Sequence, residues 1–68
     1  MERHEALTKA QGRSMTRGDV QLVICRTDHP HFTGEWYYVI GYAEKHAWTP
    51  GEHVVDAFQD GESVEVAV

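Results

Sequence analysis

The chain has 68 residues, which is enough for one small domain, and its hydrophobic content of 41% and charged content of 25% exclude a disordered composition. A domain of this length buries only about 60% of its unfolded surface, so we expect a closed sheet, self-association or a partner to support it. The formal net charge is −5, from 11 acidic and 6 basic residues. This charge opposes general attraction to nucleic-acid phosphates, which depends mostly on Lys and Arg.

The single cysteine, Cys25, excludes an intrachain disulfide and fits a reducing compartment. No apolar run approaches the roughly 20 residues that are needed to cross a bilayer. The first residues also lack the apolar segment of a secretory signal. We therefore expect a cytoplasmic protein, and no motif indicates a cofactor.

Residues 1–17 predict a loose, flexible N-terminal arm ahead of a domain of residues 18–68. Leu7 is the only large apolar side chain in the helix-favouring part of this segment, and a short helix with little to bury is marginal in water. Gly12 then interrupts the pattern. We expect at most a transient helical turn here, and the alternative is an arm that folds onto a partner.

Two segments rich in β-branched and aromatic residues predict strands, at residues 20–26 and 35–43. Val20, Leu22 and Ile24 share the face of the first strand that better suits a core. The second strand is apolar on both faces, so alternation does not identify its buried side. Residues 27–34 between them form a loop.

Residues 52–60 are ambiguous. Thr49 with Glu52 matches a helix capping box, which favours a short helix. Asp60-Gly61, flanked by two β-rich runs, instead favours a hairpin, and we prefer the hairpin. A strict two-residue turn would place Asp56 opposite Glu65, an unfavourable pair of like charges.

These elements predict an all-β fold, a small antiparallel β-barrel or rolled sheet of four to five strands. The motifs Gly18-Asp19-Val20 and Gly34-Glu35-Trp36-Tyr37, followed by the hairpin, resemble the Tudor-like branch of the small five-stranded barrels, which share the architecture of Src-homology-type domains. The resemblance implies recognition of methylated Lys or Arg by an aromatic cage. It assigns cage positions to Tyr37, Cys25, Ala57 and Asp60. Only Tyr37 is aromatic, so the cage is not matched.

The five histidines raise the question of a metal site. His29 and His31 are the best candidates, but their spacing is not a recognised zinc pair, and we assign no metal. Cys25 with a histidine and Asp28 contains the residue types of a nucleophile, a base and an orienting acid. No spacing brings them together, so we predict that the protein is not an enzyme.

The sequence favours a non-catalytic protein-binding module, a small regulator or inhibitor of the kind that phages and bacteria encode. We expect exposed aromatic residues to anchor a larger partner with a basic surface, and acidic residues to steer it. The predicted partner-binding residues are Phe32, Tyr37, Trp48, Asp56, Asp60, Glu62 and Glu65. The alternatives are a nucleic-acid-binding small barrel and an acidic protein that mimics nucleic acid. A homo-oligomer also stays open.

Overall fold

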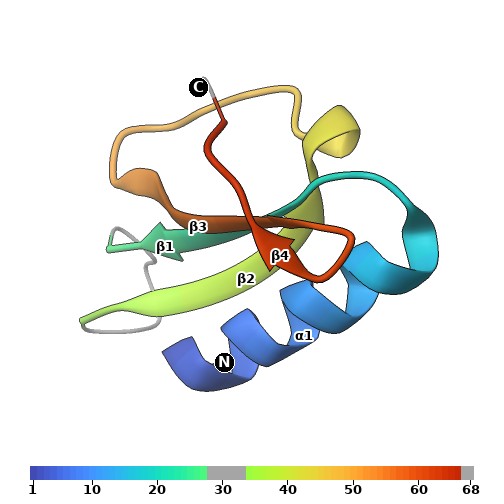
Figure 1. Cartoon of the computed structure of the whole chain (residues 1–68). Coiled ribbons are helices and arrows are strands. Elements are labelled where there is room, and N and C mark those ends of the chain that lie inside the picture. The colour runs from blue at the N-terminus through green and yellow to red at the C-terminus, as the bar shows by residue number, and fades with distance from the viewer. Residues whose placement is uncertain (28–33, 67–68) are drawn as a thin grey trace.

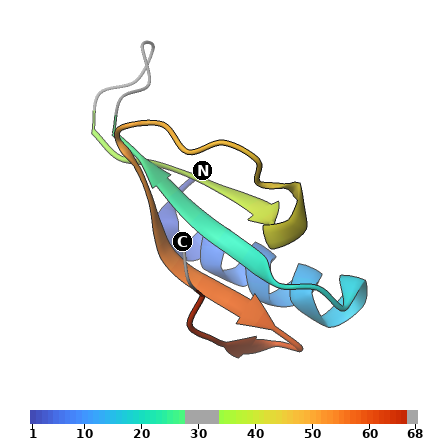
Figure 2. The same ribbon diagram turned by 90° about the horizontal axis from the view of Figure 1, so that it is seen from above.

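The computed structural model describes residues 1–27 and 34–66. Helix α1 (Arg3–Arg17) is followed by β1 (Gln21–Arg26), β2 (Trp36–Gly41), the short 3-10 turn η1 (Tyr42–Glu44), β3 (Glu52–Gln59) and β4 (Glu62–Ser63). The strands form one antiparallel sheet in the order β2-β1-β3-β4. Figures 1 and 2 show α1 lying across one face of this sheet and the connection after β2 lying over the other.

The prediction of an all-β barrel is wrong. The fold is α+β, with an open sheet whose end strands, β2 and β4, do not pair with each other within the described ranges. A strand order that ends at β2 and at the two-residue β4 leaves both edges of the sheet unclosed. The prediction of a loose N-terminal arm is also wrong, because that segment forms α1 and covers one face of the sheet.

The helix forms because its small residues recur at the helical period. Ala6, Ala10 and Ser14 are four positions apart, share one face, and are 0% exposed. Small side chains let α1 lie close to the sheet, where it covers a core cluster that includes Val23, Cys25, Tyr37 and Phe58. Gly18 ends the helix in the left-handed conformation, with φ of 75°.

The central strand β1 is buried on both faces. Val23 and Cys25 face the helix, whereas Leu22 and Ile24 face the opposite side and belong to a second cluster with Ala57. Val64, in the C-terminal segment, packs against this second cluster. Both faces of the predicted strand are therefore core, which explains why Leu22, Val23, Ile24 and Cys25 form an unbroken apolar run.

The predicted hairpin is confirmed as β3 and β4. Asp60 and Gly61 have φ of 53° and 83°, the two positive values that a type I′ turn requires. Gln59 pairs with Glu62, and the ladder finishes where the Val64 N–H donates to the Ala57 carbonyl at 2.8 Å. The chain then diverges.

This divergence removes the pair of like charges that the turn predicted. The ladder ends one position before Asp56 would oppose Glu65. Asp56 Oδ1 instead accepts hydrogen bonds from Ser63 Oγ at 2.6 Å and from the Ala57 N–H at 2.8 Å. The Asp56 carboxylate, which would face Glu65 in a longer ladder, therefore stabilises the end of the shorter ladder between β3 and β4.

Candidate functional site

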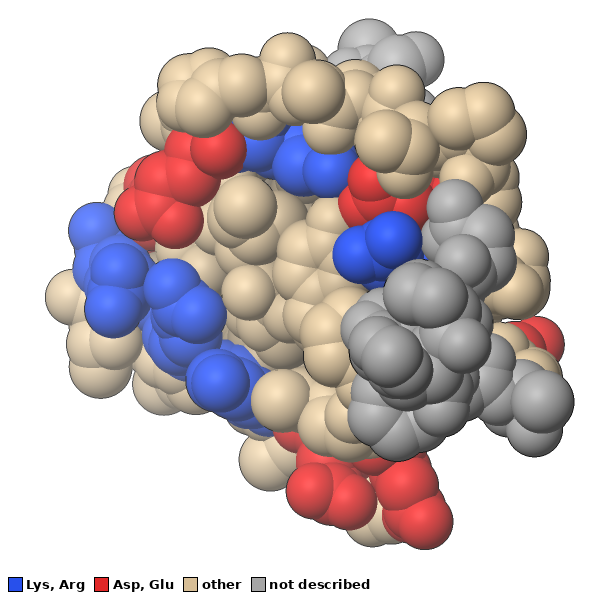
Figure 3. All heavy atoms as spheres, turned by 180° about the vertical axis from the view of Figure 1, so that it is seen from behind, with Lys and Arg blue, Asp and Glu red and all other residues tan. Residues whose placement is uncertain are grey.

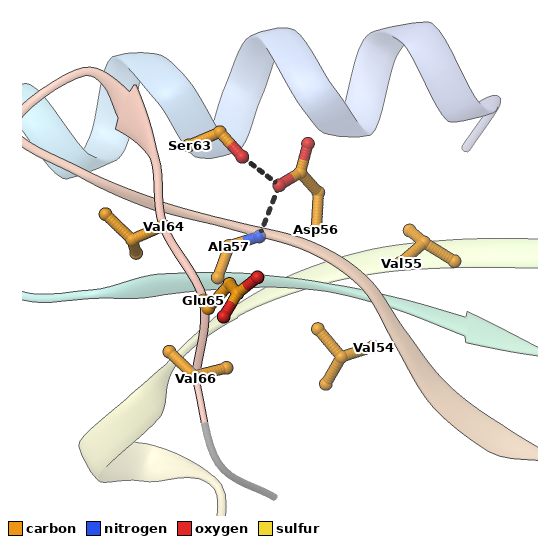
Figure 4. A pocket seen from close by; sticks show the side chains of 8 residues that line it. All are labelled: Val54, Val55, Asp56, Ala57, Ser63, Val64, Glu65 and Val66. Carbon is orange, nitrogen blue, oxygen red and sulfur yellow. Dashed lines mark hydrogen bonds between the residues drawn. The ribbon is translucent and has the colours of Figure 1, made fainter.

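An open groove of about 460 Å³ lies between the outer side of β3 and the C-terminal segment that follows β4 (Figure 4). It exists because β4 pairs with only the last two residues of β3, so the rest of that strand has no neighbour on its outer side in the described part of the chain. The groove is lined by Val54, Val55, Asp56, Ala57, Ser63, Val64, Glu65 and Val66.

The main chain of Val54 faces this groove. Hydrogen-bonded and non-hydrogen-bonded pairs alternate along an antiparallel ladder. The Thr27 N–H donates to the Gly51 carbonyl at 3.1 Å, so β1 residues at odd positions direct their main chain toward β3. Val54 pairs with Ile24, just after the register shift between Val23 and Ile24. Because Ile24 has an even number, its main chain points away from β3, and the pair is not hydrogen-bonded. The N–H and C=O of Val54 therefore point outward.

The groove has apolar walls and an acidic rim. Its four lining valines are half-buried. Val54, Val64 and Val66 pack against the second core cluster, whereas Val55 packs against the cluster on the helix side. The Glu65 carboxylate is exposed, and the Asp56 carboxylate lies beside the groove at the end of the ladder. Such a surface suits a segment that carries both apolar and basic side chains.

The four acidic residues predicted from sequence lie on one hairpin and its extension. Asp56 and Glu65 line the groove. Asp60 is in the turn, Glu62 begins β4, and both are exposed. The structure thus brings these carboxylates to the same edge of the sheet.

The predicted aromatic anchors do not form one surface. Phe32 lies outside the described residues. Tyr37 is 6% exposed in the core beneath α1, and its hydroxyl donates to Glu35 Oε2 at 2.5 Å. That hydrogen bond, together with burial, raises the pKa of Tyr37 to about 12. Trp48 is 42% exposed, on the connection between β2 and β3.

A buried polar clamp holds this connection over the sheet. Lys45 Nζ lies 3.0 Å from Glu52 Oε2 and donates to the Tyr38 hydroxyl at 3.1 Å. The Tyr38 hydroxyl also donates to Glu52, and the side chains of Lys45 and Glu52 are only 9% and 5% exposed. Thr49 binds Glu52 Oε1 through its N–H at 3.2 Å and its hydroxyl at 2.5 Å. Every polar group of the clamp therefore has a partner.

The clamp keeps both of its charges. Burial alone would raise the pKa of Glu52, but hydrogen bonds from Thr49, Tyr38 and Lys45 outweigh it and lower that pKa to about 2. Burial alone would lower the pKa of Lys45, but its bonds to Tyr38 and Glu52 outweigh it and raise that pKa. Because a general acid or base works best with a pKa near the operating pH, these shifts suit a structural ion pair better than proton transfer.

The residues considered for a nucleophile and for metal binding are not gathered at one site. Cys25 is 1% exposed in the core, and Asp28, His29 and His31 lie outside the described residues. Sequence reasoning missed one possible ligand group, in which side-chain atoms of Glu2, His4 and Glu5 lie within 4.8 Å of one another on the first turn of α1. All three are exposed acidic or imidazole groups, and we assign no metal to them.

Sequence reasoning also missed the valine walls and the clamp. The spacing of Thr49 and Glu52 did indicate that the two residues interact, but we interpreted the interaction as a helix capping box. The structure uses the same contacts in a turn, where the Glu52 N–H donates to the Thr49 carbonyl at 3.1 Å. The cage positions implied by the Tudor resemblance do not converge on a surface, because Tyr37, Cys25 and Ala57 are buried.

Comparison of the chain with protein-family models, with curated proteins and with solved structures finds no significant match. Within residues 1–27 and 34–66, no helix combines the length and apolar character needed to cross a bilayer.

Proposed function

We propose that this protein is a non-catalytic protein-binding module whose groove takes an extended, basic segment of a larger partner. The observation that carries the proposal is the groove itself, which combines an unpaired strand edge, valine walls and carboxylates. By binding such a segment, a domain of this size would act as a regulator or inhibitor of the protein to which the segment belongs.

The strand edge supports binding by strand addition. In this mode the main chain of the peptide pairs with an exposed edge, and alternate side chains enter flanking pockets. The outward N–H and C=O of Val54 offer the main-chain contacts. Val54, Val64 and Val66 all line the groove on the face of the second core cluster, so apolar side chains of the incoming segment would lie against these valines.

Charge supports a basic segment. Asp56 and Glu65 lie beside the groove, and Asp60 and Glu62 extend the acidic edge toward the turn. Complementary charge raises the rate of association and rejects segments of the wrong sign. The same acidity opposes the phosphates of nucleic acid.

Fluorescence anisotropy with a labelled Lys-Val-Lys-Val-Lys-Val-Lys peptide tests the proposal. We expect binding that weakens roughly tenfold in Glu65→Lys, because rim charges steer association. Binding should be unchanged in Glu2→Lys, a matched exposed control at the N-cap of α1. N-methylation of alternate peptide nitrogens should abolish binding by removing main-chain donors. Failure of the peptide to bind, or equal loss in both variants, would refute the groove as the binding site.

A further inference from the structure

The opposite edge of the sheet, at β2, also has unpaired main-chain groups. The Tyr42 N–H donates to the Val20 carbonyl at 2.8 Å, which makes this a hydrogen-bonded pair in the register that runs from Gln21 opposite Gly41. The alternation of pairs along the ladder then directs the main chains of Tyr37 and Val39 away from β1. In the described chain β2 has β1 as its only neighbour, so this edge is available for another strand.

One flank of α1 borders this edge. The other flank faces the hairpin turn, where Gln11 Nε2 donates to the Gly61 carbonyl at 2.8 Å. Lys9, Arg13 and Arg17 recur at four-residue spacing on the flank away from that turn, which is the side of β2. We call these three residues the basic stripe.

Figure 3 views the molecule from the β2 side. Lys and Arg side chains follow one border of a hollowed surface, along the helix, with Asp and Glu side chains at its corners. The longest row of positive charge follows the helix, and further Lys or Arg side chains lie across the hollow, where Asp and Glu side chains adjoin them.

The charges of the basic stripe are not neutralised within the described structure. No ion pair engages any of the three side chains in residues 1–27 and 34–66. Arg13 Nε is also buried without a hydrogen-bond partner there. The charges of the basic stripe are therefore open to neutralisation by an acidic partner.

We propose that the β2 edge and the basic stripe together bind an extended acidic segment of a partner protein by strand addition. Four helical residues advance about 6 Å and two strand residues about 6.7 Å, and α1 runs alongside β2 in Figures 1 and 2. Acidic residues at alternate positions of an added strand would therefore keep step with Lys9, Arg13 and Arg17.

A second copy of the chain suits this edge less well. Two copies joined through β2 around a twofold axis normal to the sheet would bring two basic stripes together, because a twofold interface uses the same patch twice. The acidic hairpin lies at the other edge of the sheet, so it does not relieve that repulsion. Charge thus selects an acidic partner.

Anisotropy with a labelled Glu-Val-Glu-Val-Glu-Val-Glu peptide tests this inference separately from the groove, which takes the opposite charge. We expect Lys9→Gln and Arg17→Gln each to weaken binding several-fold, and the double variant at least tenfold. Thr8→Glu is the matched control, because it makes the same charge change at the neighbouring exposed position on a different flank and should leave binding intact. Binding by the wild type should also shift the amide resonance of Val39.

Several results would overturn the inference. These are absence of binding by the acidic peptide, equal losses in Lys9→Gln and Thr8→Glu, and undiminished binding of a peptide N-methylated at alternate nitrogens. A concentration-dependent dimer in sedimentation that strengthens in Arg17→Gln would assign the edge to a second copy instead. Loss of Lys-Val peptide binding with retention of Glu-Val peptide binding would defeat the groove alone, and the reverse would defeat this inference alone.

Discussion

The two faces of the sheet are covered by different physical means. On one face α1 packs Ala6, Ala10 and Ser14 against the strands, so that cover depends on close contact between small groups. On the other face the connection after β2 is held by the buried pair of Lys45 and Glu52. An apolar contact responds to volume, whereas an ion pair responds to charge and pH. The two covers should therefore fail under different conditions.

The largest expected effect comes from breaking the clamp. Lys45→Met leaves the Glu52 carboxylate buried without its cation, which typically costs about 3–5 kcal/mol of the free energy of unfolding. Urea unfolding measures the loss. The double variant Lys45→Met/Glu52→Gln should recover a large part of it, because no unpaired charge then stays buried. A double variant as unstable as the single one would show that the pair does not hold the connection.

Acid should weaken the clamp face more selectively than the helix face. The pKa of Glu52 is about 2 in the folded chain and 4.5 as the reference value. Its contribution to stability is therefore fully present above about pH 4.5 and is lost as pH falls toward 2. Urea unfolding between pH 5 and 2.5 should show a fall in the wild type that is reduced in Glu52→Gln. Parallel pH profiles in both proteins would contradict this assignment.

Volume should matter on the helix face. Ala10 is 0% exposed in the cluster between α1 and the sheet, and Ala10→Leu adds three carbon atoms there. Overpacking of this kind typically costs about 1–3 kcal/mol. Gln11→Leu at the neighbouring exposed position is the control. It adds a Leu side chain without overpacking and loses only the hydrogen bond to the Gly61 carbonyl. Thermal unfolding followed by circular dichroism compares the two, and equal melting temperatures would argue against close packing of α1.

The smallest expected effect is at the hairpin turn. Gly61 has φ of 83°, and an added Cβ would lie 3.0 Å from Met15 Cγ. Gly61→Ala should cost about 1 kcal/mol through its backbone alone, with a further loss if Met15 does not move. Gly34→Ala is a control at similar φ of 86° with no neighbour within 4 Å. A larger loss at Gly34 would mean that contact between α1 and the turn is unimportant.

The strands were predictable and the architecture was not. The β-branched, apolar composition of residues 20–26 and the Asp60-Gly61 turn are local signals, and they located β1 and the hairpin. The helix was missed because its buried face consists of Ala and Ser, which carry little hydrophobic signal on their own. They become core only when a sheet lies against them.

The candidate site depends on features that no local pattern encodes. The groove beside Val54 arises because the ladder stops at Val64, one position before Asp56 would oppose Glu65. The position of the basic stripe required knowing that the 1–17 segment is helical. Lys9, Arg13 and Arg17 have the spacing of a helix face, but in a flexible arm that spacing would not place the three side chains on one side.

The buried position of Cys25 makes its thiol a probe of local unfolding. It is the only cysteine of the chain, lies in the central strand, and is 1% exposed beneath α1. A thiol reagent can reach it only when the helix leaves or the sheet opens, so its rate of labelling measures the free energy of that opening when reclosing is fast. Peptides at either edge should slow the reaction, each in proportion to its own binding. One native thiol thus reports occupancy at both edges.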